Sequence, residues 1–283
     1  MANRKQRAAI AAETVAFLER GSYTLDGDCV SLSGALAKMR DGTVLYTPSE
    51  LESLVQSLDP PTPCDTTIKV KNCTTWSAAR SLLADGYPDP LCLNFASAKN
   101  PGGGFLSGSQ AQEECLSRSS GLHQSLCSNM IYYDANRSHA SPLYTNHIIY
   151  SPSVPVFRDD EDQLLREPYN VSVVTSPAVN AGAVRENKPG LVSKIAPTMK
   201  QRIQSVLALG RHHGHKSVVL GAWGCGVFGN DPTDIARWFS DPLHTDARFV
   251  NAFDHIVFAV LDRTDSTPTY GAFCKIFGDA PMP

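Results

Sequence analysis

The stretch LCLNFASAKNPGGG, residues 91–104, decides the expected fold. It begins with a mostly apolar run, which is typical of a strand that is covered on both faces of a sheet. A turn of successive glycines follows at once, and residues 111–127 then predict a helix with Leu116, His123 and Cys127 along one stripe. Strand, glycine turn and helix in that order indicate an α/β domain.

The flanking sequence repeats this alternation. Strands are expected at 43–46, 68–70, 171–174, 217–220 and 255–261, and helices at 4–20, 76–84, 192–212 and 232–239. Asp231 and Pro232 suit the N-cap and first position of the last of these helices. We therefore predict a three-layer α/β/α fold with a central, mostly parallel or mixed sheet. Residues 1–66 are expected to form an N-terminal extension packed on a domain at 67–283.

Composition limits the classes of partner and location. The chain has 25 basic and 28 acidic residues, which leaves no electrostatic footprint for duplex DNA. No run approaches the ~20 apolar residues that span a bilayer. The N-terminal segment carries Glu13 and Glu19, which is not typical of a signal or transit peptide. We expect an intracellular, cytoplasmic protein, with access to the nucleus if its host is eukaryotic, and no membrane partner.

Three loops should lie at the carboxyl ends of the strands, where such sheets bind ligands: 98–112, 175–182 and 221–230. The glycine amides of the first could converge on an oxyanion or on ribose hydroxyls, although a plain flexible turn is an equal alternative. The loop at 224–230 lies between a strand and a helix, an arrangement that cradles a diphosphate. It matches neither the Walker A nor the G-x-G-x-x-G pattern, which disfavours ATP and nicotinamide enzymes. Phe228 within it could cover a ribose or base, or equally fill the core.

Gln112-Glu113-Glu114 follows the first glycine turn, at the start of the expected helix. Such glutamates often only complement the helix dipole. Adjacent helical side chains point about 100° apart, so these two carboxylates would have different tasks. Cleavage of a ribosyl glycosidic bond needs an acid for the leaving oxygen and a base for water, and one carboxyl group can serve as both in turn. This chemistry requires no metal ion and no cofactor.

Gly102-Gly103-Gly104 followed by Gln112-Glu113-Glu114 resembles the signature of poly(ADP-ribose) glycohydrolases. The wider pattern is similar to the microbial type, which is built on a macrodomain, and residues 94–98, 175–180 and 221–230 share it. The resemblance implies a macrodomain-like catalytic domain that cleaves ribose–ribose bonds of poly(ADP-ribose), mainly from the chain end, and releases ADP-ribose. The implied role is reversal of ADP-ribosylation, as in the response to DNA damage, with ADP-ribosylated proteins as carriers of the substrate.

The resemblance also implies roles for individual residues. Glu114 would protonate the leaving ribose oxygen and then activate water, and Glu113 would bind ribose hydroxyls. The remaining implied substrate contacts are Asn100, Gly102, Gly103 and Gly104 at the distal ribose, Gly224, Cys225, Gly226, Val227 and Gly229 at the diphosphate, Phe228 near the terminal ribose, and Gln112, Ser176 and Asn180. Residues around Glu13-Thr14 are candidates for contacts with adenine.

Two rival functions remain open at this point. A macrodomain could bind ADP-ribose without cleaving it, but such a binder does not need the glutamate pair. A hydrolase of mono-ADP-ribosyl groups on proteins would attack the same ribose carbon, so the sequence separates it less well. The acidic run at 158–162 is expected to be a solvated loop.

Overall fold

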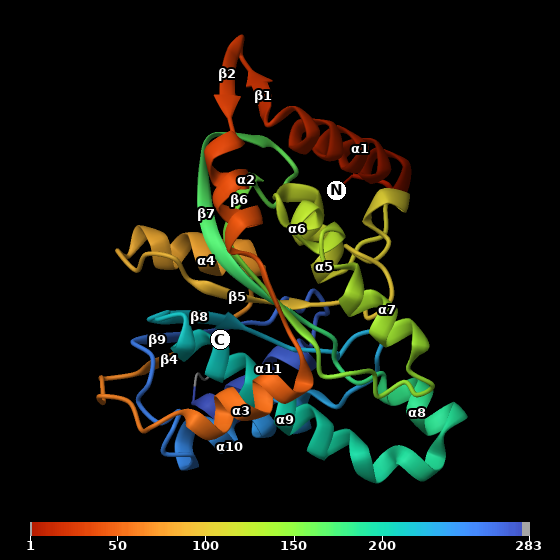
Figure 1. Cartoon of the computed structure of the whole chain (residues 1–283), viewed down its shortest axis with the longest axis vertical. Coiled ribbons are helices and arrows are strands. Elements are labelled where there is room, and N and C mark those ends of the chain that lie inside the picture. Colours follow the sequence, from red (N-terminus) through yellow and green to blue (C-terminus); the bar gives the residue numbers. More distant parts are fainter. Residues whose placement is uncertain (1, 279–283) are drawn as a thin grey trace.

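The computed structural model describes residues 2–278 and places a mixed seven-stranded sheet at the centre of the molecule (Figure 1). In spatial order the strands are β3 (Val44–Tyr46), β6 (Ile148–Arg158), β7 (Leu164–Ser176), β5 (Leu91–Phe95), β8 (Ser217–Leu220), β9 (His255–Ala259) and β4 (Thr67–Lys71). The five strands from β7 to β4 run parallel, whereas β6 and β3 are antiparallel to their neighbours. The parallel part therefore presents its carboxyl ends at one edge, as predicted.

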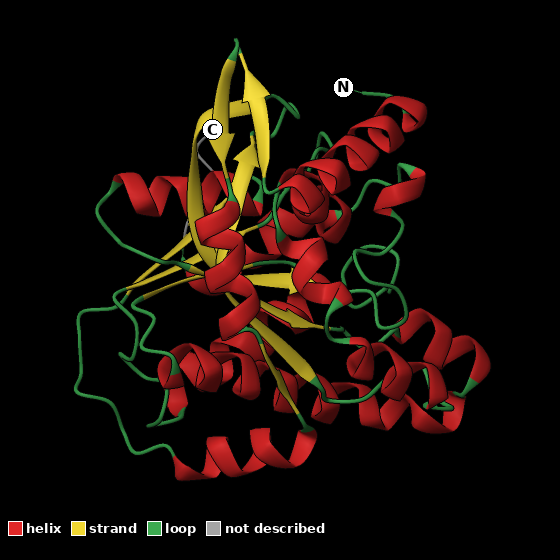
Figure 2. Ribbon diagram, turned by 45° about the horizontal axis from the view of Figure 1, so that its top comes forward, coloured by secondary structure: helices red, strands yellow, loops and turns green. Residues whose placement is uncertain are grey.

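Helices cover both faces of this sheet (Figure 2), and a separate apolar core lies between the sheet and the helices on each face. One core is covered by α3 (Pro48–Ser57), α8 (Ala181–Asn187), α9 (Ile195–His212), α10 (Pro232–Thr245) and α11 (Pro268–Phe277). The other is covered by α1 (Arg4–Arg20), α2 (Ser33–Gly42), α4 (Thr75–Ala84), α5 (Gln112–Ser119), α6 (Leu122–Cys127) and α7 (Met130–Ser138). The predicted three-layer α/β/α fold is confirmed. Within residues 2–278, no helix combines the length and apolarity that crossing a membrane requires.

The N-terminal part contributes directly to the sheet. Strand β3 pairs with β6, so the predicted extension supplies one edge strand of the domain. Between α1 and α2, a hairpin of β1 (Ser22–Leu25) and β2 (Asp28–Ser31) lies against the far end of β7, where the Tyr23 hydroxyl donates to the carbonyl of Leu165. The boundary at residue 66 stays a prediction, but residues 2–66 pack as part of the same unit.

The prediction of one continuous helix over 111–127 was wrong, because this segment forms two helices, α5 and α6. Ser120 between them is extended (φ −148°, ψ 177°) and forms a bridge with Val156 of β6. The next residue, Gly121, is so close to β6 that an added Cβ would lie 2.9 Å from Cδ of Pro155. The approach of β6 stops the helix here, and the break falls at Ser120-Gly121, a dipeptide that is itself a local turn signal.

Candidate active site

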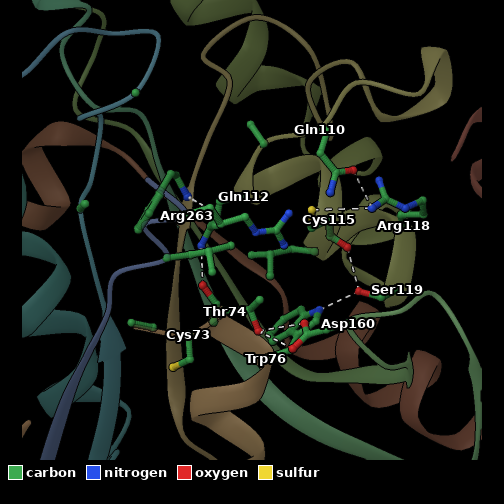
Figure 3. Close-up of a pocket in the computed structure, with 18 of the residues that line it drawn as sticks. Cys73, Thr74, Trp76, Gln110, Gln112, Cys115, Arg118, Ser119, Asp160 and Arg263 are labelled. Carbon is green, nitrogen blue, oxygen red and sulfur yellow. Dashed lines mark hydrogen bonds between the residues drawn. The ribbon is translucent and has the colours of Figure 1, made fainter. Parts of the chain in front are cut away.

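A cavity of about 450 Å³ opens at the carboxyl ends of β5, β8, β9 and β4. Its lining combines apolar side chains such as Trp76, Phe95 and Leu116 with polar ones (Figure 3). Of the residues predicted to bind substrate, only three line this cavity: Gln112, Cys225 and Gly226. The glycine turn and the glutamate pair lie beside it, on the β5 and β7 side of the sheet edge.

Glu114 is held by the glycine turn itself. Its Oε1 accepts the amide of Gly104 (3.0 Å) and its Oε2 accepts the amide of Ala111 (3.1 Å). Gly103 lies against both carboxylates with φ +59°, and an added Cβ would be 2.5 Å from Oε1 of Glu114 and 3.1 Å from Oε2 of Glu113. A glycine is therefore required at position 103 by conformation and by space, which rules out the plain flexible turn.

Glu113 is almost fully buried, with 3% of its surface exposed. Its Oε2 accepts the amide of Ser97 (2.7 Å) and its Oε1 accepts Nδ2 of Asn94 (3.2 Å). The pKa of Glu113 is raised to about 8, mainly by burial and in smaller part by the neighbouring carboxylate of Glu114, while the hydrogen bonds from Ser97 and Asn94 act in the opposite direction. Near neutral pH, Glu113 is therefore held mostly in its neutral form, and the separate tasks of the two glutamates stay a prediction.

Gln112 braces the end of β5. Its side-chain amide donates to the carbonyl of Leu93 (2.7 Å) and to the hydroxyl of Thr75 (3.0 Å), and its oxygen accepts the amide of Phe95 (2.8 Å). The side chain thus continues the hydrogen bonding of the strand where the sheet ends. Its contact with substrate stays a prediction, but its local role is to fix α5 against β5.

The other two predicted loops are joined to each other. Asn230 donates to the carbonyls of Val179 (2.8 Å) and Gly224 (3.1 Å). The amide of Gly182 donates to the carbonyl of Phe228 (2.9 Å). Gly224 has φ +75°, and an added Cβ there would lie 2.5 Å from Cβ of Ala178. The diphosphate-type loop therefore has a fixed shape that depends on the loop after β7.

The remaining predicted contacts differ in exposure. Asn100 is exposed, whereas Ser176 is fully buried with its hydroxyl unpaired in the structure. Asn180 caps α8, its side chain accepting the amide of Ala183 (3.0 Å). Val227 is 95% exposed, and Phe228 is half-buried. Ser176 is thus buried in the sheet and Asn180 serves as a helix cap. The substrate contacts of all these residues stay predictions.

Phe228 packs partly against the core and faces a residue that the sequence did not single out. Its ring centroid is 6.0 Å from that of Tyr144, which lies on the loop between α7 and β6. Tyr144 adopts φ +60°, a strained backbone for a bulky residue, of the kind that often marks a functional site. Phe228 thus fills the core in part, its contact with a ribose or base stays a prediction, and Tyr144 is an added candidate for the site.

Within the acidic run at 158–162, Asp160 and Glu161 are exposed in a loop, as predicted, but members of the run also pair with other parts of the protein. Asp162 pairs with the buried guanidinium of Arg118 (2.7 Å), which also donates to Gln110 (3.1 Å). Asp160 accepts the hydroxyl of Thr74 (2.8 Å), and all of these residues line the cavity (Figure 3). These pairings could not be predicted, because the partners lie far away in the sequence.

Contact of the residues around Glu13 and Thr14 with adenine stays a prediction. Thr14 is fully buried and donates to the carbonyl of Arg118 (2.6 Å), and Glu13 pairs with the guanidinium of Arg158. Neither side chain lines the cavity. Both instead fasten α1 to the elements that build the cavity wall.

A three-layer fold with two fixed glycine loops beside a carboxylate at the parallel strand ends defines a macrodomain-like enzyme class. The model of the microbial-type poly(ADP-ribose) glycohydrolase catalytic domain matches residues 11–159, and the chain belongs to this family. No curated protein matches the chain.

Solved structures agree with this family over nearly the whole chain. The poly(ADP-ribose) glycohydrolase of Thermomonospora curvata is 47% identical, with a TM-score of 0.93, over 97% of this chain and 100% of that one. The same enzyme bound to the inhibitor ADP-HPD gives 47% identity and a TM-score of 0.90 over 96% and 99%. The Deinococcus radiodurans enzyme in complex with ADP-ribose gives 44% identity and a TM-score of 0.81 over 90% and 98%.

Proposed function

We propose that this protein hydrolyses the ribose–ribose glycosidic bonds of poly(ADP-ribose) and releases ADP-ribose. Family membership supports this, as does the likeness to glycohydrolases solved with ADP-ribose and with an inhibitor. The observation that carries the proposal is the position of Glu114, a partly exposed carboxylate held by the amides of Gly104 and Ala111 beside the buried Glu113.

The bond would break through an oxocarbenium-like state at the anomeric carbon of the distal ribose. Glu114 donates a proton to the leaving ribose oxygen, and its carboxylate then takes a proton from the attacking water. Glu113, held mostly neutral near pH 7 by burial, binds ribose hydroxyls without competing for the role of anion. The glycine backbone of 102–104 supports the ribose, because no side chain blocks its approach.

The rest of ADP-ribose would extend along the edge of the sheet. The amides of 224–229 suit the diphosphate, since they lie between β8 and the start of α10. The cavity of about 450 Å³ borders Gly226 and Gln112, and its volume is in the range of sites for small ligands. We assign this cavity to the adenosine half of the molecule.

The proposal also covers which bonds of the polymer are cleaved and what carries the polymer. We infer action mainly from the chain end, on polymer carried by ADP-ribosylated proteins within the cell, with a link to the response to DNA damage. The resemblance of the glycine–glutamate signature to the microbial enzymes supports the chain-end preference. The near-balanced charge of 25 basic and 28 acidic residues favours a compact anionic ligand over duplex DNA.

Turnover of two substrates tests the function. Wild-type protein and Glu114→Gln are incubated with ADP-ribose polymer and with a mono-ADP-ribosylated protein, and released ADP-ribose is measured. We expect release from the polymer by wild type, and a loss in Glu114→Gln of at least about 100-fold at unchanged ADP-ribose affinity, because the amide keeps the shape but cannot transfer the proton.

The exposed Glu186→Gln on α8 controls for the loss of one carboxylate. Release from the mono-modified protein alone would assign the protein to the mono-ADP-ribosyl hydrolases. Tight binding of ADP-ribose with no release from either substrate would leave a passive binding domain.

A further inference from the structure

Helix α1 reaches the active-site loop through two arginines near its N-terminus. Nε of Arg4 donates to the carbonyl of Ser107 (3.0 Å), and Nε of Arg7 donates to the carbonyl of Gly108 (2.9 Å). The turn 105–107 and α1 also pack closely along their length. These contacts join residues that are about 100 positions apart in the sequence. The proposed chemistry uses neither arginine.

The contact between α1 and the loop depends on a glycine. Gly108 is buried with φ +77°, and an added Cβ would lie 2.0 Å from the carbonyl oxygen of Arg4 and 3.1 Å from the amide of Ala8. No other residue allows the two backbones to be this close. Conformation, space and two hydrogen bonds therefore all fix the loop against α1 at this point.

From this contact a short chain of hydrogen bonds leads to Glu114. The carbonyl of Gly104 accepts the amides of Ser107 (3.0 Å) and Ser109 (3.1 Å), so the segment held by α1 sets the orientation of Gly104. The amide of the same Gly104 donates to Oε1 of Glu114. The second donor to Glu114, the amide of Ala111, lies two residues after Ser109 in the same loop.

We propose that Arg4 and Arg7 are positioning residues that hold the catalytic loop, so that Gly104 and Ala111 present their amides to Glu114. The inference rests on the proposed function of Glu114. The side chains of both arginines donate to carbonyls of the loop, and we expect them to act through the loop. Since a small misplacement of a catalytic group lowers the rate steeply, loosening this contact should affect turnover more than affinity.

The test compares Arg7→Ala, Arg7→Lys and Lys5→Ala in steady-state hydrolysis of the polymer. Lys5 is an exposed cation next to Arg4 on the same helix, so its removal controls for charge. We expect kcat of Arg7→Ala to fall on the order of tenfold. Arg7→Lys, which keeps a donor, should recover part of this loss, and Lys5→Ala should match wild type. The affinity for ADP-ribose should stay near the wild-type value in all three.

Gly108→Ala provides a second variant that removes no charge and should lower kcat in the same way. The folded fraction of each variant is measured by circular dichroism at the assay temperature. A loss of activity that only follows the folded fraction, or equal turnover by Arg7→Ala and Lys5→Ala, overturns the inference. Absence of release by wild type would instead contradict the proposed function.

Discussion

At the scale of single residues, Glu113 and Glu114 are neighbours with opposite surroundings. Glu114 is partly exposed and accepts two amides, while Glu113 is buried beneath it with Asn94 and Ser97 as donors. The backbone of Gly103 lies against both carboxylates. The adjacent positions on a helix, together with this glycine, let one chain segment supply two carboxyl groups with different burial and different hydrogen-bond donors.

The raised pKa of Glu113 makes stability depend on pH. The unfolded side chain titrates near 4.5 and the folded one at about 8, so between these values the folded state keeps a proton that the unfolded state loses. Stability from this group is fully present below the lower value and is lost as pH rises, by at most ~1.4 kcal/mol per pH unit. Glu113→Gln does not titrate. The free energy of unfolding of this variant relative to wild type, measured with urea, should therefore increase from pH 5 to pH 8. Parallel curves for the two proteins would contradict the assignment.

Gly103→Ala tests the packing of the glycine turn. The new Cβ would lie 2.5 Å from Oε1 of Glu114 and would keep a left-handed backbone, which costs about 1–2 kcal/mol. We expect polymer hydrolysis to fall by about 100-fold, because Glu114 is displaced. Gly190→Ala, where no atom lies within 4 Å of the added carbon, is the matched control. Equal activity of both variants would show that Glu114 does not need this contact.

At the scale of elements, local signals predicted several helices and strands but not every capped one, since α3 begins with a capping box at Thr47 and Glu50 and was not predicted. α1 begins and ends at the predicted residues 4 and 20, and β8 occupies 217–220 as expected. β6 was not predicted, because Pro152 and Pro155 interrupt its pattern. The structure accommodates the interruption with a register shift between Ser151 and Val154.

Arg202 on α9 shows how an element far from the motif shapes the site. Its guanidinium is fully buried and donates to the carbonyls of Pro177 and of residues 143–145, and to Asn146. Burial lowers its pKa to about 10. It thereby ties the loop that carries Tyr144 to the loop after β7.

Replacement of the Arg202 guanidinium should lower the free energy of unfolding. Arg202→Met leaves the buried carbonyl of Pro177 and the part-buried carbonyls of residues 143–145 without this donor, and a buried group left unpaired costs about 1–3 kcal/mol. We expect the free energy of unfolding, measured in urea, to fall by at least about 3 kcal/mol, whereas Arg237→Met on the exposed face of α10 should change it little. A loss below about 1 kcal/mol in Arg202→Met would show that other donors replace the guanidinium.

At the scale of the whole molecule, the site draws on loops from most of the chain. The glycine turns and the glutamate pair could be predicted, because each is a short motif visible in the sequence, although its conformation also depends on contacts with other segments. Arg118, Tyr144 and the contact of α1 with Gly108 could not, because they act across long separations in sequence and their residue types are common on surfaces. The acidic run at 158–162 shows the same limit, since its role depends on a partner in α5.

The central claim is that the carboxyl group of Glu114 lies at the bond to be broken. A crystal structure of Glu114→Gln with a short ADP-ribose polymer tests it most directly. The account predicts the side chain of position 114 within about 3 Å of the glycosidic oxygen, with the diphosphate on residues 224–229. A side chain directed into bulk water, with another carboxylate next to the anomeric carbon, would contradict it.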